Sequence, residues 1–352
     1  MTTDKLRILS FGAGAVGTYI GGSLLLQGHE VVFIERPVTA DYLRQHGLSL
    51  NLLGTEHHLP RPTIVEDVAA ALETGPFEAA LFALKSFDTA AVVESLVSYK
   101  KQLPPILCLQ NGVDNEEIIA AGLGHKRLIP GTLTSAIGRR GIGSIQLERL
   151  RGIGVAAGHP LSERLASALS EAGLNARLYP NAADMKWSKM LTNLVGNASS
   201  AILDMPPGDI FAHRELFEIE IQQLREILAV MQAQGIQVVD LPGTPVRLLA
   251  FAVRRLPAVL ARPLLSKAIG GGRGGKMPSF HIDLHSQRGS SEVDYLNGAV
   301  VRAGEKTGVP TPANRFLNNT LLALVNEKMP VRTFARDPEA LLRQWKLATQ
   351  SV

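Results

Sequence analysis

Residues 8–35 have the sequence ILSFGAGAVGTYIGGSLLLQGHEVVFIE, in which an apolar run leads into six residues of the pattern G-x-G-x-x-G. The apolar run predicts a buried strand, and the segment after the glycines predicts a helix that stops at Gly28. A second apolar run ends in Glu35. A glycine pattern between a strand and a helix, with an acidic residue after the next strand, is typical of a dinucleotide-binding site.

Each glycine of the pattern has its own structural role in such a site. Gly12 permits a tight turn, Gly14 lets the backbone approach a pyrophosphate, and Gly17 lets helix and strand pack closely. The helix N-terminus offers unpaired N–H groups and the positive end of its dipole to the phosphates. The residues expected at the cofactor are therefore Gly12, Ala13, Gly14, Ala15, Val16, Gly17 and Glu35.

Length and composition favour a two-domain globular protein. The chain has 352 residues, 45% of them hydrophobic and 19% charged, with a formal net charge of +4. This charge suits anionic ligands such as nucleotides or carboxylates, and without a dense Lys/Arg run we expect no nucleic-acid partner. The single cysteine, Cys108, excludes an intrachain disulfide and is expected to be a small buried hydrophobe. Without a signal-peptide pattern or a membrane-length apolar run, we expect a soluble cytoplasmic protein.

Residues 1–180 alternate short apolar runs with helical or loop stretches, which predicts a parallel α/β sheet. Strands expected at 79–84 and 106–109 are followed by Lys85 and by Gln110-Asn111-Gly112. Because ligands bind beyond the carboxyl ends of such strands, we expect Lys85 and Asn111 beside the glycine pattern. The alternatives are a solvated Lys85 and a plain turn at Asn111.

Further strands are expected at 128–132, 142–148 and 152–157, the last two as a hairpin, and a helix at 161–172. A second hairpin is expected to join 48–53 to 57–64. His57 and His58 are expected to be plain surface residues, because no third ligand stands at a metal-like spacing. No metal site is predicted.

From about Pro180 the pattern becomes helical, with amphipathic helices predicted at 181–202, 209–234 and 292–306. The predicted domains are therefore 1–180 and 181–352. Residues 246–269 are apolar with spaced arginines and two prolines, which favours short packed helices over contact with a membrane surface. The glycine-rich residues 270–276 have the flexibility expected of a lid. The apolar helical half is compatible with a homodimer.

Candidate catalytic residues lie on the helix predicted at 181–202. Lys189, Asn193 and Asn197 are spaced i, i+4, i+8 and would share one face. Polar groups flanked by apolar residues are costly to bury unless they bind something. The alternative is a solvated surface stripe. Lys186 is out of this register and is expected to be solvated.

A second polar cluster covers residues 278–283 and 288–298. Ser290 or Ser291 is a candidate N-cap, which places Glu292 in the first helical turn, where the helix dipole favours its ionised form. The alternative is that Glu292 only caps the helix.

Together these motifs resemble the ketopantoate reductases (2-dehydropantoate 2-reductases). The resemblance covers nearly the whole chain and depends on GAGAVG at 12–17, LK at 84–85, QNG at 110–112, WSKMLTNLVGN at 187–197, and PSF at 278–280 with RGSSEVDYLNGAVV at 288–301. It implies an N-terminal Rossmann domain and a helical C-terminal domain, with the active site in the cleft between them. It also implies reduction of ketopantoate to pantoate with NADPH, on the route to pantothenate.

The resemblance also implies a role for individual residues. Lys189 would be the general acid, and Glu292 would bind the substrate hydroxyl. Asn111 would help place the lysine and the nicotinamide. The residues that would hold the substrate are Asn193, Asn197 and Ser279. Partial burial lowers the pKa of such a lysine towards the working range, whereas cofactor phosphates and Glu292 oppose that shift.

The chain departs from the family pattern at several positions. The family usually has a small or apolar residue before the arginine that pairs with the 2′-phosphate of NADP, and here Glu35 precedes Arg36. NADP is favoured because Arg36 is retained, but Glu35 would suit the ribose 2′-OH of NAD and repel a 2′-phosphate. Pro207 and Lys276 stand where the family has pocket asparagines, and 246–275 looks longer than usual.

The sequence thus predicts an NAD(P)H-dependent reductase of a small 2-oxo acid, ketopantoate first. One alternative is a family member that reduces another 2-oxo or 3-oxo acid. A second is a regulatory protein that binds NAD(P) without turnover, and a third is a flavoprotein, because Glu35 would also suit the ribose of FAD.

Overall fold

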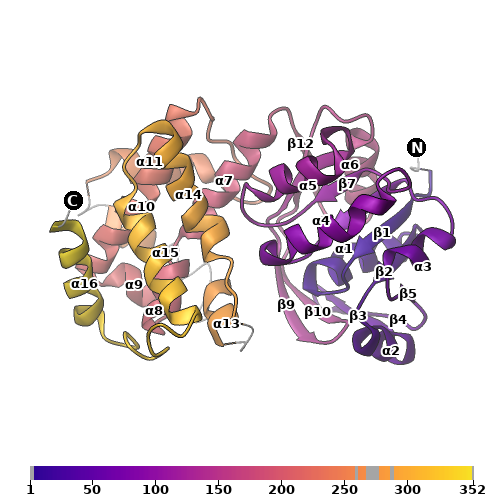
Figure 1. The fold of residues 1–352 in the computed structure, drawn as a ribbon, viewed down its shortest axis with the longest axis horizontal. Helices are drawn as coiled ribbons and strands as arrows, with labels where there is room; N and C mark the ends of the chain where they lie inside the picture. The colour runs from indigo at the N-terminus through magenta and orange to yellow at the C-terminus, as the bar shows by residue number, and fades with distance from the viewer. Residues whose placement is uncertain (1–3, 258–260, 267–276, 286–288, 351–352) are drawn as a thin grey trace. The chain divides into compact units, whose positions relative to one another are not determined.

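The computed structural model describes residues 4–257, 261–266, 277–285 and 289–350 (Figure 1). The chain forms two compact units. The sheet unit comprises Met1–Gln110, Asp114–Lys186 and Leu241–Thr244. The helical unit comprises Asn111–Val113, Trp187–Asp240 and Pro245–Val352.

An eight-stranded sheet forms the centre of the sheet unit. In spatial order its strands are β12 (Ala176–Tyr179), β11 (Ile153–Ala156), β8 (Leu128–Leu133), β7 (Ile106–Cys108), β6 (Ala79–Phe82), β1 (Arg7–Phe11), β2 (Glu30–Ile34) and β5 (Thr63–Val65). All neighbours are parallel except β8 and β11. The strand order reverses direction at β1, between β6 and β2. Such a switch point is where open α/β sheets bind their ligands, which confirms the predicted α/β fold class.

Side chains of β1 alternate between two cores, as expected for a strand covered on both faces. Ile8 packs in the core that includes residues of α1 (Ala15–Leu26), and Leu9 packs in the opposite core. The first core also takes residues from α2 (Pro37–His46) and α6 (Ser162–Glu171). The second core takes residues from α3 (Val68–Glu73), α4 (Thr89–Leu96) and α5 (Asn115–Leu123). Cys108 is fully buried in this second core, as predicted.

Short 3₁₀ helices also lie in the connections of the sheet unit: η1 (Ser86–Asp88), η2 (Val97–Tyr99) and η3 (His125–Arg127). The first two of these flank α4, which therefore has a 3₁₀ turn at each end.

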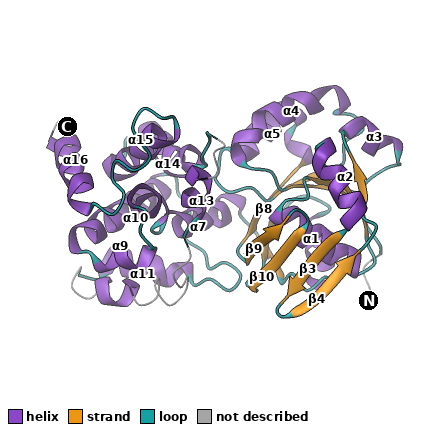
Figure 2. Ribbon diagram, turned by 90° about the horizontal axis from the view of Figure 1, so that it is seen from below, coloured by secondary structure: helices purple, strands orange, loops and turns teal. Residues whose placement is uncertain are grey.

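A second sheet has the order β4 (Thr55–Leu59), β3 (Leu48–Leu52), β10 (Ser144–Arg149) and β9 (Ala136–Gly141), and α1 contacts β3, β9 and β10 (Figure 2). The antiparallel β3–β4 pair confirms the hairpin predicted from 48–53 and 57–64, although residues 63–65 belong to the main sheet. The hairpin predicted from 142–148 and 152–157 is wrong. Gly143, at φ 64°, allows the tight turn between β9 and β10, so β10 pairs there and β11 joins the main sheet.

The helical unit is built around the 20-residue helix α10 (Arg214–Ala233). Its partners are α9 (Pro207–Ala212), α11 (Val246–Arg255), α14 (Val293–Thr307), α15 (Pro312–Val325) and α16 (Pro338–Gln350). The other helices described in this unit are α8 (Asn197–Leu203), α13 (Ser279–His285), a helix at 261–266, and the part of α7 (Ala182–Leu194) from Trp187 onward. Of the residues that the structure describes, no helix has the length and apolar character to cross a membrane.

Two helices expected to be continuous are broken. The one predicted at 181–202 divides at Gly196, which adopts φ 60° between α7 and α8. The one predicted at 209–234 divides at His213, whose Nδ1 accepts the N–H of Leu216 and caps α10. In the segment predicted to hold short helices, α11 ends at Arg255, before Pro257. The glycine-rich residues 270–276 lie outside the described residues.

Candidate active site

The glycine loop connects β1 to α1 with the geometry that a pyrophosphate site needs. Gly12 has φ 95°, and a Cβ on Gly17 would lie 2.0 Å from the Gly12 carbonyl oxygen, so no larger residue fits there. A Cβ on Gly14 would meet nothing within 4 Å, so the outer side of the loop is open. In the described part of the chain, no side chain caps α1, and its first turn contains no acidic residue. These residues fit a dinucleotide phosphate at the helix N-terminus.

Glu35, at the end of β2, is turned towards this loop. Its Oε1 accepts the backbone N–H of Ala13 at 2.5 Å, and the side chain is half-buried. Arg36, the next residue, is exposed and stands at the N-cap of α2. The carboxylate is thus held at the glycine loop, the position from which an acidic residue contacts an adenosine ribose.

The residues after β6 and β7 lie close to the same loop. A Cβ on Gly12 would be 3.3 Å from the Leu84 side chain, so the Leu84-Lys85 pair adjoins the glycine pattern. Lys85 is half-buried. Nε2 of Gln110 donates to the carbonyl oxygens of Leu84 and Lys85 at 3.1 and 3.3 Å, which ties the ends of β6 and β7 together.

Asn111 belongs to the helical unit and contacts α7 there. The Nδ2 of Asn193 donates to the Oδ1 of Asn111 at 3.0 Å. The backbone of Gly112 lies so close to α14 that a Cβ there would be 2.6 Å from the carbonyl oxygen of Tyr295. Lys189 is half-buried on α7, one turn before Asn193. The structure therefore gathers Asn111, Lys189 and Asn193 within one unit.

Asn197 is almost fully buried and links three segments. Its Nδ2 donates to the carbonyl oxygen of Asn193 at 3.1 Å and to the Oγ of Ser279 at 3.3 Å, and its Oδ1 accepts the N–H of Phe280 at 3.1 Å. Ser279, at the start of α13, is thereby joined to the predicted cluster. The expectation of a shared helical face is wrong for Asn197, because it begins α8 beyond the break at Gly196.

Glu292 is buried, with 2% of its surface exposed. It is the N-cap residue of α14 and not part of its first turn, so the predicted helix start is wrong by one residue. The predicted N-cap at Ser290 or Ser291 is therefore also wrong, although the Oγ of Ser291 accepts the N–H of Val293 at 3.2 Å.

Pro207 is buried at the first position of α9. A Cβ on Gly196 would lie 3.0 Å from the Pro207 Cβ, so this proline packs behind the junction of α7 and α8. Lys276 and Arg288, the other notable residues near the predicted substrate site, lie outside the described residues.

The prediction that Lys186 is solvated is wrong. Its Nζ lies 2.7 Å from Oε1 of Glu116, and it donates to the carbonyl oxygens of Gln110 at 2.7 Å and Gly131 at 3.3 Å. Burial opposes its charge, but the Glu116 carboxylate outweighs burial and raises the pKa of Lys186 above its ordinary value. Lys186 thus fixes the start of α7 to the end of β7. The sequence held no signal for this pair, whose members lie far apart along the chain.

Comparisons with known proteins identify the family. The family model for ketopantoate reductase PanE/ApbA matches residues 8–157, and the model for the ketopantoate reductase PanE/ApbA C terminal matches residues 181–325. The 2-dehydropantoate 2-reductase of Lactococcus lactis is 25% identical over 321 residues, covering 89% of this chain and 96% of the relative. The corresponding protein of Streptococcus pyogenes serotype M1 is 22% identical over 317 residues, with 89% and 95% covered.

Solved structures show the same fold. A PanE/ApbA family ketopantoate reductase from Ralstonia eutropha JMP134 is 27% identical with a TM-score of 0.76, covering 92% of this chain and 99% of that one. D-mandelate dehydrogenase with NADH and anilino(oxo)acetate is 24% identical with a TM-score of 0.74, with 92% and 99% covered. The two family models together match most of the chain, so this protein belongs to the ketopantoate reductase PanE/ApbA family of NAD(P)-dependent 2-oxo acid reductases.

Proposed function

We propose that this chain reduces ketopantoate to pantoate with NADPH, with residues 1–180 binding the cofactor and residues 181–352 carrying the substrate-binding side chains. The observation that carries the proposal is the hydrogen bond between Asn193 and Asn111. It joins Asn111, three residues beyond the end of β7, to the helix that bears Lys189. The curated relatives named 2-dehydropantoate 2-reductase support the same substrate.

Reduction of a 2-oxo acid requires a hydride at C2 and a proton at the carbonyl oxygen. The reduced nicotinamide, when bound, supplies the hydride. Lys189 donates the proton from its half-buried position on α7. Glu292 accepts a hydrogen bond from the substrate hydroxyl. Asn111 positions the lysine relative to the nicotinamide.

In this proposal, polar groups around α7, α8 and α13 anchor the substrate. Asn193 and Ser279 hold the substrate, and Asn197 does so partly by donating to Ser279. A buried amide already engaged in three hydrogen bonds is well suited to fixing its neighbours.

For the cofactor, Gly12, Ala13, Gly14, Ala15, Val16 and Gly17 cradle the pyrophosphate, with Lys85 nearby. Arg36 is exposed and pairs with a 2′-phosphate, which favours NADPH. The carboxylate of Glu35, held at the loop by Ala13, opposes that phosphate and makes NADH the alternative cofactor.

A second candidate substrate is a 2-oxo acid with an apolar or aromatic side group. Pro207 is buried where the family pattern has a pocket asparagine, and a proline supplies apolar surface without a donor. The fold is also shared by D-mandelate dehydrogenase, whose structure contains NADH and anilino(oxo)acetate.

The test follows oxidation of NADPH and of NADH at the nicotinamide absorbance with ketopantoate, phenylglyoxylate and pyruvate. The proposal expects the highest kcat/KM with ketopantoate and NADPH. A higher kcat/KM with phenylglyoxylate would favour the second candidate. Cofactor binding without turnover of any 2-oxo acid would contradict both and favour a regulatory role, whereas a yellow, flavin-containing protein would contradict the nicotinamide cofactor itself.

A further inference from the structure

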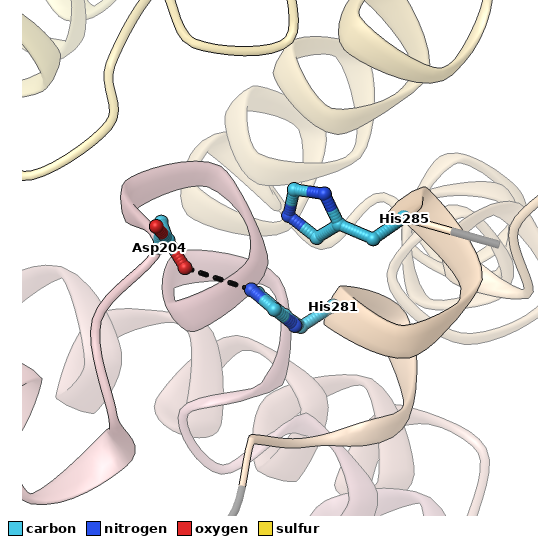
Figure 3. A group of neighbouring side chains, drawn as sticks. All are labelled: Asp204, His281 and His285. Carbon is cyan, nitrogen blue, oxygen red and sulfur yellow. Dashed lines mark hydrogen bonds and ion pairs between the residues drawn. The ribbon is translucent and has the colours of Figure 1, made fainter. Parts of the chain in front are cut away.

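The helical unit contains a side-chain cluster that the proposed reaction does not use: Asp204, His281 and His285 (Figure 3). The two histidines are four residues apart on α13, and Asp204 ends α8. In Figure 3 both imidazoles extend from α13 towards Asp204. One potential ligand atom from each residue lies within 4.8 Å of the others. Two imidazoles and a carboxylate form a donor set that suits borderline divalent transition metals.

The distances in this cluster are close to those of a metal site. Ligand atoms lie about 2.0–2.1 Å from zinc, so two ligands of one tetrahedral ion are about 3.3 Å apart. Nε2 of His281 is already 2.8 Å from Oδ1 of Asp204. His285 is exposed, and its ring centroid is 4.3 Å from that of His281 at 48° between the planes. One nitrogen of this exposed ring lies within 4.8 Å of a potential ligand atom of each of the other two residues.

Rigid elements hold two of the three ligands. Asp204 ends α8 at φ 49°, in the left-handed region that aspartate tolerates better than most residues. The carbonyl oxygen of Leu203, just before it, accepts the N–H of Arg336 at 2.7 Å. At the other side, Phe280 is fully buried and donates its N–H to Asn197, which fixes α13 just before His281. The pair is therefore pre-organised.

We propose that Asp204, His281 and His285 bind one divalent transition-metal ion of the Zn²⁺ type, with a fourth position open to water. The ion replaces the hydrogen bond between His281 and Asp204. His281 then binds through Nε2 as the neutral tautomer that carries its single proton on Nδ1, because a ring nitrogen must be deprotonated to bind metal. Mg²⁺ and Ca²⁺ are excluded by their preference for oxygen ligands.

Such an ion joins α8 to α13 at a second point. The first link is at the start of both helices, where Asn197 donates to Ser279. The second is the metal, at the end of α8. A metal at this place holds α13, and with it Ser279, against α8. The proposed metal site is thus structural, and its existence does not depend on which substrate the protein reduces.

A positive charge in the described part of the chain opposes the ion. The exposed guanidinium of Arg332 acts electrostatically on His285. Removing this charge should strengthen metal binding by about two- to fivefold, the range expected for a solvent-screened interaction. Arg332→Ala is therefore a variant with an expected gain, which a nonspecific loss of structure cannot imitate.

The test uses the full-length protein, freed of metal with a chelator and titrated with Zn²⁺ by calorimetry and with Co²⁺ by visible absorbance. We expect one ion per chain, with Zn²⁺ binding unchanged by excess Mg²⁺. His285→Ala should weaken binding at least about tenfold, since loss of even an outer-shell partner of a metal ligand costs about that much. His58→Ala removes an exposed histidine in the sheet unit and should leave binding unchanged.

A second measurement locates the ion without relying on activity. Zn²⁺ should slow amide hydrogen exchange at residues 279–285 in the unmodified chain, and it should not do so in His285→Ala or Asp204→Asn. The proposal is overturned if the protein binds no Zn²⁺ or Co²⁺. It is also overturned if His281→Ala and His285→Ala bind the ion as tightly as the unmodified chain.

Discussion

The carboxylate of Glu220 accepts the backbone N–H of Gly196 at 2.8 Å, although Glu220 lies on α10 and Gly196 separates α7 from α8. The same carboxylate accepts the hydroxyl of Ser199 at 2.5 Å and the amide of Gln223 at 2.8 Å. Glu220 is completely buried. The buried Glu220 carboxylate thus accepts hydrogen bonds from polar groups at the helix break that separates Asn193 from Asn197.

Glu220→Ala should strongly destabilise the helical unit. It leaves the donors of Gly196, Ser199 and Gln223 without this acceptor inside the protein, so we expect a loss of about 2–5 kcal/mol in the free energy of unfolding. Urea denaturation measures it. Glu218→Ala, on the exposed side of the same helix, removes a surface ion pair with Arg214 and should cost no more than about 0.5 kcal/mol. Equal losses in the two variants would show that the buried carboxylate has no special role.

Gly196→Ala should lower the free energy of unfolding more than Gly235→Ala does. Both glycines have positive φ, 60° and 70°, and an alanine in that region costs about 1–2 kcal/mol. At Gly235 the added Cβ meets nothing within 4 Å, whereas at Gly196 it lies 3.0 Å from the Cβ of Pro207. Thermal unfolding of both variants compares them. If they lose the same stability, the α7–α8 junction tolerates the contact with Pro207.

Substitution of two lysines three residues apart on α7 should affect different properties. We expect the change at Lys189 to affect turnover and the change at Lys186 to affect stability. Lys189→Ala should lower kcat by about 10²–10⁴-fold, the usual worth of a positioned general acid, with little change in cofactor affinity or unfolding. Lys186→Ala should lower the free energy of unfolding by about 3–5 kcal/mol, because it leaves the charge of Glu116 buried and without its ion pair. Steady-state kinetics and denaturation on both variants separate the roles. Near-normal turnover in Lys189→Ala would remove Lys189 from the mechanism.

Substitutions of Glu35 and Arg36 should shift the preference between NADPH and NADH in opposite directions. Glu35→Gln removes the negative charge that Ala13 holds at the loop, so the ratio of kcat/KM for NADPH to that for NADH should rise. Arg36→Gln removes the exposed guanidinium and should lower the same ratio, mainly through the KM for NADPH. An unchanged ratio in both variants would mean that neither side chain reaches the ribose.

The parts of the fold that could be predicted were those with strong local signals. The strand, glycine turn and helix at 8–35, the strands before Lys85 and Asn111, and the helix after Ser291 follow from periodicity, glycine and capping residues that are close in the sequence. The predicted roles of Lys189, Glu292 and the other site residues stay predictions, because they depend on a bound substrate and cofactor.

The errors arose where partners far apart in the sequence decide the outcome. Helical periodicity continues through Gly196, and only Glu220 and Pro207 show why the helix stops there. Lys186 looks solvated until its partner Glu116 is known. The i, i+4 spacing of His281 and His285 is local, but their partner Asp204 lies 77 residues before His281, so the sequence alone could not complete that cluster.

The way the chain divides between its two units limits how this protein can be taken apart or recombined. Three residues, Asn111–Val113, leave the sheet unit, and Leu241–Thr244 return to it later. A chimera that joins 187–352 to another nucleotide-binding domain would therefore lack Asn111, the hydrogen-bonding partner of Asn193. A replacement of the helical unit must therefore include residues 111–113 as well as 187–352, so that the hydrogen bond between Asn111 and Asn193 is kept.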